Sequence, residues 1–179
     1  YRLQVPDIAP YAKQDWPRNM KRFAAMITRM DTHIGELMEL LKQLGIDRNT
    51  LVIFSSDNGP HKEGGGNPIF FASSGNLRGI KRDLYEGGIR VPMIARWPGT
   101  IAAGQMSGHI SAAWDILPTC CDAAGRAIPP NIDGLSLMPT LRGQSHNQPQ
   151  HAFLYWEFHE RGSKQAVRVT SSYQAVQNA

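Results

Sequence analysis

The feature that most constrains this sequence is an unbroken apolar run, Leu51 to Phe54, which follows a long amphipathic segment. The run is continuous rather than alternating, as in a strand that is covered on both faces. Residues 18–44 precede it, with apolar side chains at three- and four-residue steps and Gly45 where a left-handed helix cap is expected. A helix, a short loop and a buried strand in this order predict an α/β fold, with a mostly parallel sheet sandwiched by helices.

The rest of the chain indicates one more strand and one more helix of the same domain. A buried strand is predicted over residues 91–97, where Pro92 is tolerable only near the start. A helix is predicted over residues 116–124, with Asp115 as its N-cap and Gly125 as its stop. The aromatic and β-branched residues beyond this helix follow a different pattern.

That pattern begins near His151, where residues 153–158 and 166–169 indicate antiparallel strands of a small C-terminal subdomain. We expect residues 1–145 to form the C-terminal half of the α/β domain. Residues 146–179 are expected to begin the subdomain, which is truncated before it can build a core of its own. A half-domain of this kind should expose apolar helix and strand surface.

Composition excludes several classes of partner. The 179 residues carry a formal net charge of +4, which suits an anionic substrate and is too weak and too dispersed for nucleic acid. No apolar run is long enough to cross a bilayer, and nothing at the start resembles a secretion signal. The compartment is therefore not readable from these residues.

Asp57-Asn58-Gly59 directly follows the first predicted strand. In an open α/β sheet, ligands bind beyond the carboxyl ends of the strands, and a carboxylate beside an amide oxygen suits a hard cation such as Ca²⁺. Asn-Gly is also a favoured dipeptide of tight turns. A long glycine-rich loop follows here instead of a second alternating strand, which weakens the turn interpretation.

A second candidate segment, residues 79–92, precedes the second predicted strand and reaches the same edge of the sheet. Lys81 is a flexible point charge that can hold an anionic oxygen, although a lone lysine is usually a solvated surface cation. Gly87 and Gly88 indicate a backbone with positive φ or one pressed against a neighbour. Glu86 and Arg90 flank these glycines and could pair to fix the loop.

Together these segments resemble the second half of the catalytic domain of formylglycine-dependent (type I) sulfatases, in the alkaline-phosphatase-like superfamily. The resemblance covers nearly the whole chain and rests on Leu-Val-Ile-Phe-Ser-Ser-Asp-Asn-Gly, on the Gly-x-Lys-x4-Glu-Gly-Gly-x-Arg-Val-Pro string that begins at Gly79, and on Asp133-Gly134-x-Ser136-Leu137. It implies a sulfuric ester hydrolase that acts on sulfated small molecules or carbohydrates, and a periplasmic or secreted location.

Residue by residue, the resemblance makes Asp57 and Asn58 ligands of the active-site Ca²⁺ and Lys81 a catalytic contact to the sulfate oxygens. His61 could line the substrate pocket or protonate a leaving group, because an imidazole titrates near neutrality. The family's nucleophile, a formylglycine made from the first residue of Cys/Ser-x-Pro-x-Arg, has no counterpart, since none of the twelve prolines has an arginine two residues later.

Three hypotheses remain open from the sequence. The leading one is a sulfatase whose upstream half carries the formylglycine, so that this chain alone is inactive and binds Ca²⁺ poorly with only two ligands. The second is a phosphoryl or phosphonyl ester hydrolase of the same superfamily. The third is a non-catalytic binding homologue, and the residue at the upstream nucleophile position would distinguish all three.

Overall fold

The computed structural model describes residue 5 and residues 7–159, 164–169 and 172–176, and it divides the chain into two compact units. Unit 1 comprises residues 1–47 and 58–91, and unit 2 comprises residues 48–57 and 92–179. The predicted boundary between residues 145 and 146 lies inside unit 2 and stays a prediction.

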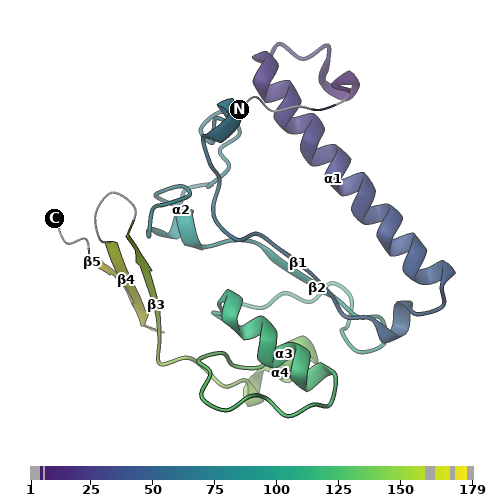
Figure 1. Ribbon diagram of the computed structural model, residues 1–179, viewed down its shortest axis with the longest axis vertical. Coiled ribbons are helices and arrows are strands. Elements are labelled where there is room, and N and C mark those ends of the chain that lie inside the picture. The colour runs from purple at the N-terminus through teal and green to yellow at the C-terminus, as the bar shows by residue number, and fades with distance from the viewer. Residues whose placement is uncertain (1–4, 6, 160–163, 170–171, 177–179) are drawn as a thin grey trace. The chain divides into compact units, whose positions relative to one another are not determined.

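Unit 1 is built on α1 (Arg18–Gln43), which confirms the predicted helix and is the longest helix in Figure 1. Gly45 has a φ of 69°, the left-handed conformation expected after the helix. The first turns of α1 are covered by an aromatic cluster that the sequence analysis did not anticipate. Its members come from the N-terminal segment, the helix and the loop after β1: Tyr11, Trp16, Phe23, Phe70 and Phe71. Residues 57–76 are therefore partly held by packing.

Unit 1 also holds α2 (Glu86–Ile89), a single helical turn, while unit 2 begins with β1 (Val52–Ser55), close to the predicted strand. The second predicted strand is β2 (Met93–Arg96), and Pro92 lies just before it. These two strands pair with each other in antiparallel register, from Val52 opposite Arg96 to Ser55 opposite Met93, as the adjacent ribbons in Figure 1 show.

The sequence predicted a mostly parallel sheet, whereas these two strands are antiparallel to each other, because the chain turns back through residues 56–92 before β2. Among the described residues, none covers a second face of either strand. The apolar side chains of β1 are half-buried, and Ile94 of β2 is 62% exposed. The continuous apolar run correctly predicted a strand. The described residues do not supply the layer that such a run implies on the second face of the strand.

The apolar core of unit 2 lies around α4 (Met138–Leu141), a short helix within residues 126–150, which we call the connector. Leu137, Met138 and Leu141 are buried, and partly buried side chains from β2, its following loop and α3 (Ile116–Ala123) pack on them: Ala95, Trp97, Ile101 and Ala123. α3 confirms the predicted helix, and Gly125 after it has a φ of 63°. The connector thus supplies much of the core of this unit.

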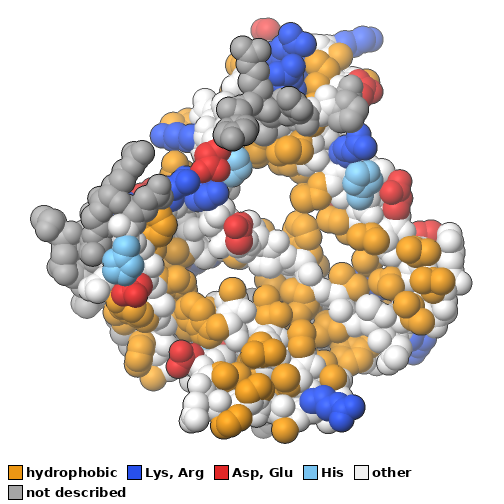
Figure 2. Space-filling model, viewed as in Figure 1, with side chains coloured by type: hydrophobic (Ala, Val, Ile, Leu, Met, Phe, Trp, Pro, Cys, Tyr) orange, Lys and Arg blue, Asp and Glu red, His pale blue; other side chains and the backbone are white. Residues whose placement is uncertain are grey.

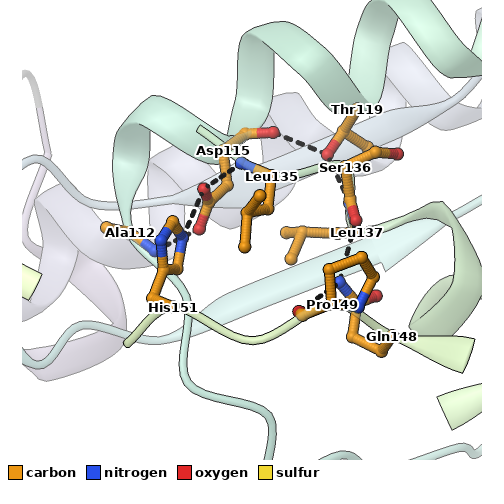
Figure 3. A network of polar contacts seen from close by, with 9 residues as sticks. All are labelled: Ala112, Asp115, Thr119, Leu135, Ser136, Leu137, Gln148, Pro149 and His151. Carbon is orange, nitrogen blue, oxygen red and sulfur yellow. Dashed lines mark hydrogen bonds and ion pairs between the residues drawn. The ribbon is translucent and has the colours of Figure 1, made fainter. Parts of the chain in front are cut away.

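Asp115 does not cap α3, contrary to expectation, and instead forms the centre of a buried polar network (Figure 3). Its backbone is already helical, with φ −76° and ψ −14°, so its side chain makes no capping hydrogen bond to the first turn. The carboxylate accepts hydrogen bonds from the backbone N–H of Ala112 and of Leu135, each at 2.8 Å. The third partner is His151, whose Nε2 lies 2.8 Å from Asp115 Oδ1.

The network continues through Thr119 and Gln148, as the dashed lines in Figure 3 show. The Thr119 hydroxyl donates to the Asp115 carbonyl at 2.6 Å and accepts from the Leu137 N–H at 2.9 Å. Gln148 Nε2 donates to the Ser136 carbonyl at 2.9 Å. These bonds satisfy buried backbone groups that would otherwise be costly, and they link α3 to the strand-bearing segment that begins at His151.

That segment forms a three-stranded antiparallel sheet in the order β3-β4-β5. β3 (Phe153–Phe158), β4 (Lys164–Val169) and β5 (Ser172–Val176) follow one another along the chain, which confirms the predicted antiparallel strands. The Trp114 and Trp156 rings lie 5.7 Å apart, so β3 also contacts the turn before α3.

Much apolar surface is exposed, as expected for a half-domain. Hydrophobic side chains reach the surface over much of the face shown in Figure 2, and the exposed ones on α1 include Ile27, Met30, Leu37 and Leu40. Among the helices that the structure describes, none has both the length and the apolar character of a membrane span.

Candidate functional site

The predicted site residues lie in the loops that follow β1 and precede β2. Asp57 is exposed and is the last residue of the β1 segment of unit 2. Asn58 is half-buried and is the first residue of the second segment of unit 1. The Asn58 Nδ2 donates to the Gly59 carbonyl at 2.9 Å. Asn58, His61 and Lys81 therefore belong to one unit, and Asp57 is joined to them through the chain.

Backbone contacts in unit 1 bring the two predicted segments together. The Gly59 N–H donates to the Gly88 carbonyl at 2.9 Å, and the Lys81 N–H donates to the Pro60 carbonyl at 2.9 Å. A Cβ atom on Gly59 would lie only 2.0 Å from the Gly87 carbonyl oxygen, too close for any side chain. The residues directly after Asn58 and those around Lys81 thus form one compact loop pair.

Gly87 and Gly88 are needed for close packing rather than for backbone freedom. Neither has a positive φ. A Cβ on Gly87 would lie 2.2 Å from the Gly79 carbonyl oxygen, and one on Gly88 would lie 2.0 Å from that of Asp83. The sequence left open whether these glycines provide a positive φ or allow close packing, and close packing is correct. The expected ion pair between Glu86 and Arg90 is also present.

Lys81 is held by an acidic partner that sequence reasoning missed. The Lys81 Nζ lies 3.2 Å from Glu63 Oε2, and the Arg82 Nη1 lies 2.7 Å from Glu63 Oε1. Hydrogen bonds from Arg82 and then from Lys81 lower the pKa of the Glu63 carboxyl. One carboxylate therefore balances two neighbouring cations, and no local sequence pattern links residue 63 to residues 81 and 82.

His61 lies in the same loop as Glu63. The Glu63 N–H donates to His61 Nδ1 at 3.1 Å, and Nδ1 lies 3.9 Å from Glu63 Oε2. Because Nδ1 accepts this hydrogen bond, the proton of the neutral ring is assigned to Nε2. Nε2 is then the ring atom that can donate a proton.

The fit of this region to a divalent cation is partial. A carboxylate and an amide oxygen on consecutive residues, Asp57 and Asn58, are ligands of the type that Ca²⁺ takes. Across the part of the chain that the structure describes, no group of three or more His, Cys, Asp or Glu side chains could hold a metal ion. The residues fit Ca²⁺ in kind but not in number, since six to eight oxygens are normal.

Comparison with known proteins decides the family. Residues 4–126 match the family model described as Sulfatase. The chain belongs to the sulfatase family. A second family model, N-sulphoglucosamine sulphohydrolase, C-terminal, matches residues 80–177 of this sulfatase chain. Membership of the formylglycine-dependent family, which the motifs around Asp57 and Lys81 predicted, is thus confirmed.

Curated relatives are sulfatases of animals. The chain is 40% identical over 136 residues to N-acetylgalactosamine-6-sulfatase of Mus musculus, an alignment that covers 72% of this chain and 25% of that protein. It is 40% identical over 133 residues to steryl-sulfatase of Homo sapiens, covering 72% of this chain and 23% of that protein. The sulfatase chain thus spans about a quarter of the length of these relatives.

Solved structures confirm the alkaline-phosphatase-like fold class. The crystal structure of Ps i-CgsB matches with a TM-score of 0.82 and 30% identity, over 99% of this chain and 38% of that one. The structure of BT4656 in complex with its substrate D-glucosamine-2-N,6-O-disulfate matches with a TM-score of 0.64 and 27% identity, over 90% of this chain and 34% of that one. Both likenesses extend over nearly all of this sulfatase chain.

Proposed function

We propose that this chain is the C-terminal half of the catalytic domain of a sulfuric ester hydrolase that acts on sulfated carbohydrates. The observation that carries the proposal is the compact loop pair, in which the Lys81 N–H is bonded to the Pro60 carbonyl, two residues after Asn58. This pairing keeps the backbone of Lys81 next to the residues that follow the Asp-Asn-Gly sequence. Sulfated carbohydrate is proposed because BT4656 is described with a sulfated glucosamine and Ps i-CgsB with k-i-k-neocarrahexaose.

In this proposal Lys81 contacts the sulfate oxygens and stabilises negative charge that develops on the sulfate or on the departing bridging oxygen. Its side chain is 29% exposed, so it is partly desolvated while remaining accessible to an anion. His61 lines the substrate pocket and can donate the Nε2 proton to a leaving group. Gly87 and Gly88 are buried and pack closely against the backbone of the Lys81 loop, which restricts its movement.

Asp57 and Asn58 would hold the Ca²⁺, together with oxygens from outside this chain. A bound divalent cation would supply charge neutralisation at the sulfate oxygens. The nucleophile, a formylglycine, would also come from outside these 179 residues, because they contain no Cys/Ser-x-Pro-x-Arg sequence. The 179-residue chain by itself is therefore expected to be inactive and to bind Ca²⁺ weakly.

The test is turnover of an aryl sulfate and a sulfated oligosaccharide by the full-length protein, compared with Lys81→Ala and the matched control Lys62→Ala. Loss of the Lys81 cation should lower kcat by about 10²–10³-fold, as for other groups that stabilise developing charge. Lys62 is exposed and lies beside His61 in the sequence, so its loss should change kcat by less than about twofold.

Two outcomes would contradict the proposal. Turnover of an aryl phosphate in place of the sulfate would favour the phosphoryl ester hydrolase. Absence of turnover of either ester, with binding of the sulfated oligosaccharide retained, would favour the non-catalytic homologue. The periplasmic or secreted location stays a prediction.

A further inference from the structure

Glu63 bridges two consecutive cations with its two carboxylate oxygens. Oε1 accepts from Arg82 at 2.7 Å, and Oε2 lies 3.2 Å from the Lys81 ammonium. Consecutive residues in extended backbone point to opposite faces, so two neighbours that reach one carboxylate require a special local conformation. The backbone of this segment supplies one.

That conformation is a tight turn with Lys81 and Arg82 at its two central positions. The Asp83 N–H donates to the Ile80 carbonyl at 2.9 Å, and the Asp83 carboxylate accepts from the Ile80 N–H at 3.0 Å. Arg82 has a φ of 76°, whereas Lys81 is not among the residues with positive φ. This is the pattern of a type II turn, whose third position favours glycine.

An arginine at this position carries a conformational cost, because a side chain disfavours the left-handed backbone. The same conformation brings its guanidinium to the carboxylate that Lys81 also contacts. Arg82 and Glu63 are both about half exposed. Ion pairs at this level of exposure contribute little stability. What the turn does achieve is to place two adjacent cations on one anion.

We propose that Lys81 and Arg82 form a two-cation clamp for one sulfate group of the substrate, and that Glu63 is a resident counter-anion which the sulfate displaces. The proposal rests on the proposed function and extends it to two residues, Arg82 and Glu63. A planar guanidinium can donate two parallel hydrogen bonds to sulfate oxygens, which the ammonium of Lys81 cannot. Arg82 therefore adds affinity and orientation, while Lys81 acts on the reacting oxygens.

The loop around Glu63 is suited to this exchange. Gly64 and Gly65, which follow Glu63, both have positive φ, at 64° and 86°. The Glu63 carboxylate is solvent-accessible, and its hydrogen bonds are made to flexible side chains rather than to backbone. The carboxylate can leave without disturbing the hydrogen bonds between Lys81 and Pro60 or between Gly59 and Gly88. Its departure makes the Lys81 ammonium and the Arg82 guanidinium accessible to the incoming monoanion.

The test uses the full-length protein, with Arg82→Gly and Glu63→Gln as the informative variants. Glycine suits the left-handed turn, so Arg82→Gly removes the guanidinium without straining the backbone. Glutamine keeps the shape of Glu63 and removes its charge. Lys62→Ala removes a positive charge from the same loop without removing either contact to Glu63, and serves as the matched control.

Two quantities are measured for each variant: the KM and kcat for a sulfated substrate, and the dissociation constant of inorganic sulfate by calorimetry. Arg82→Gly should raise KM and the sulfate dissociation constant about tenfold, with kcat within about twofold of wild type. Glu63→Gln should lower both constants about three- to tenfold, because the competing anion is gone. Lys62→Ala should change each by less than about twofold.

The outcomes are separable from the proposed function. If the wild-type protein fails to hydrolyse sulfate esters, the proposed function fails, while the calorimetric comparison still tests the clamp. Unchanged sulfate affinity in Arg82→Gly would overturn the clamp and leave a surface ion pair. Weaker sulfate binding in Glu63→Gln would overturn the counter-anion role, because Glu63 would then be positioning Lys81 instead of competing for it.

Discussion

Removal of the Asp115 carboxylate should destabilise unit 2 strongly. The side chain is fully buried, and its oxygens accept from the backbone N–H groups of Ala112 and Leu135 and contact His151 Nε2, each at 2.8 Å. In Asp115→Ala both N–H groups lose their partner at a cost of about 1–3 kcal/mol each. His151, whose side chain is 9% exposed, loses its partner as well, so the free energy of unfolding should fall by about 3–5 kcal/mol.

Asp115→Asn removes the charge of the Asp115 side chain while keeping its shape. The amide keeps one acceptor oxygen, but its NH₂ group faces a hydrogen-bond donor, so part of the network is lost. We expect about half the effect of Asp115→Ala, roughly 2 kcal/mol. Asp133→Asn is the control, because Asp133 is an exposed acid of the same unit and its neutralisation should stay within about 0.5 kcal/mol of wild type.

Urea unfolding of the full-length protein, followed by tryptophan fluorescence, measures this effect. Trp114 precedes Asp115 directly and its ring lies 5.7 Å from that of Trp156, so the signal reports on the network. An unfolding free energy for Asp115→Ala within about 0.5 kcal/mol of wild type would refute the reasoning, since the buried N–H groups would then have other partners.

Three further predictions concern the glycines and His109. Gly88→Ala should lower the urea midpoint markedly and disrupt the Lys81 loop, because its Cβ would lie 2.0 Å from the Asp83 carbonyl oxygen; a midpoint equal to wild type would contradict the packing. Gly35→Ala, within α1 and with nothing within 4 Å of the new Cβ, should raise the unfolding free energy by about 0.5–1 kcal/mol in the same assay. Burial lowers the pKa of His109 from its usual 6.5; the charge of Asp115 opposes this shift and that of His151 adds to it. Below pH 6.5 the unfolded chain therefore binds more protons than the folded chain. Stability is lost as the pH falls from 6.5 toward the lowered pKa. His109→Gln should reduce this loss between about pH 7 and 5, and an unchanged pH dependence would count against it.

The sequence was informative wherever structure depends on local pattern. The apolar periodicity of α1 and the cap at Gly45 each follow from residues within a few positions of one another. The antiparallel pairing of β1 with β2 was not predictable in this way, because an apolar run indicates a strand and carries no information on its neighbour.

Polar contacts between residues far apart in the sequence were also not predictable. Glu63 meets Lys81 and Arg82 across a loop, and Asp115 meets His151 across the connector. Neither contact has a local signature, since acid and base residues of this kind are common on protein surfaces. Asp115 directly before a helix also imitates a cap, and only the helical backbone at that residue shows that its side chain is used elsewhere.

The order of the strands has a consequence for how the chain folds. β3, β4 and β5 pair with their sequence neighbours, and only residues 159–163 separate β3 from β4, whereas residues 56–92 separate β1 from β2. Closing the longer connection costs about 2 kcal/mol more in chain entropy. The short connections favour early assembly of the C-terminal hairpins, whereas pairing of β1 with β2 requires closure of the long segment that carries Lys81.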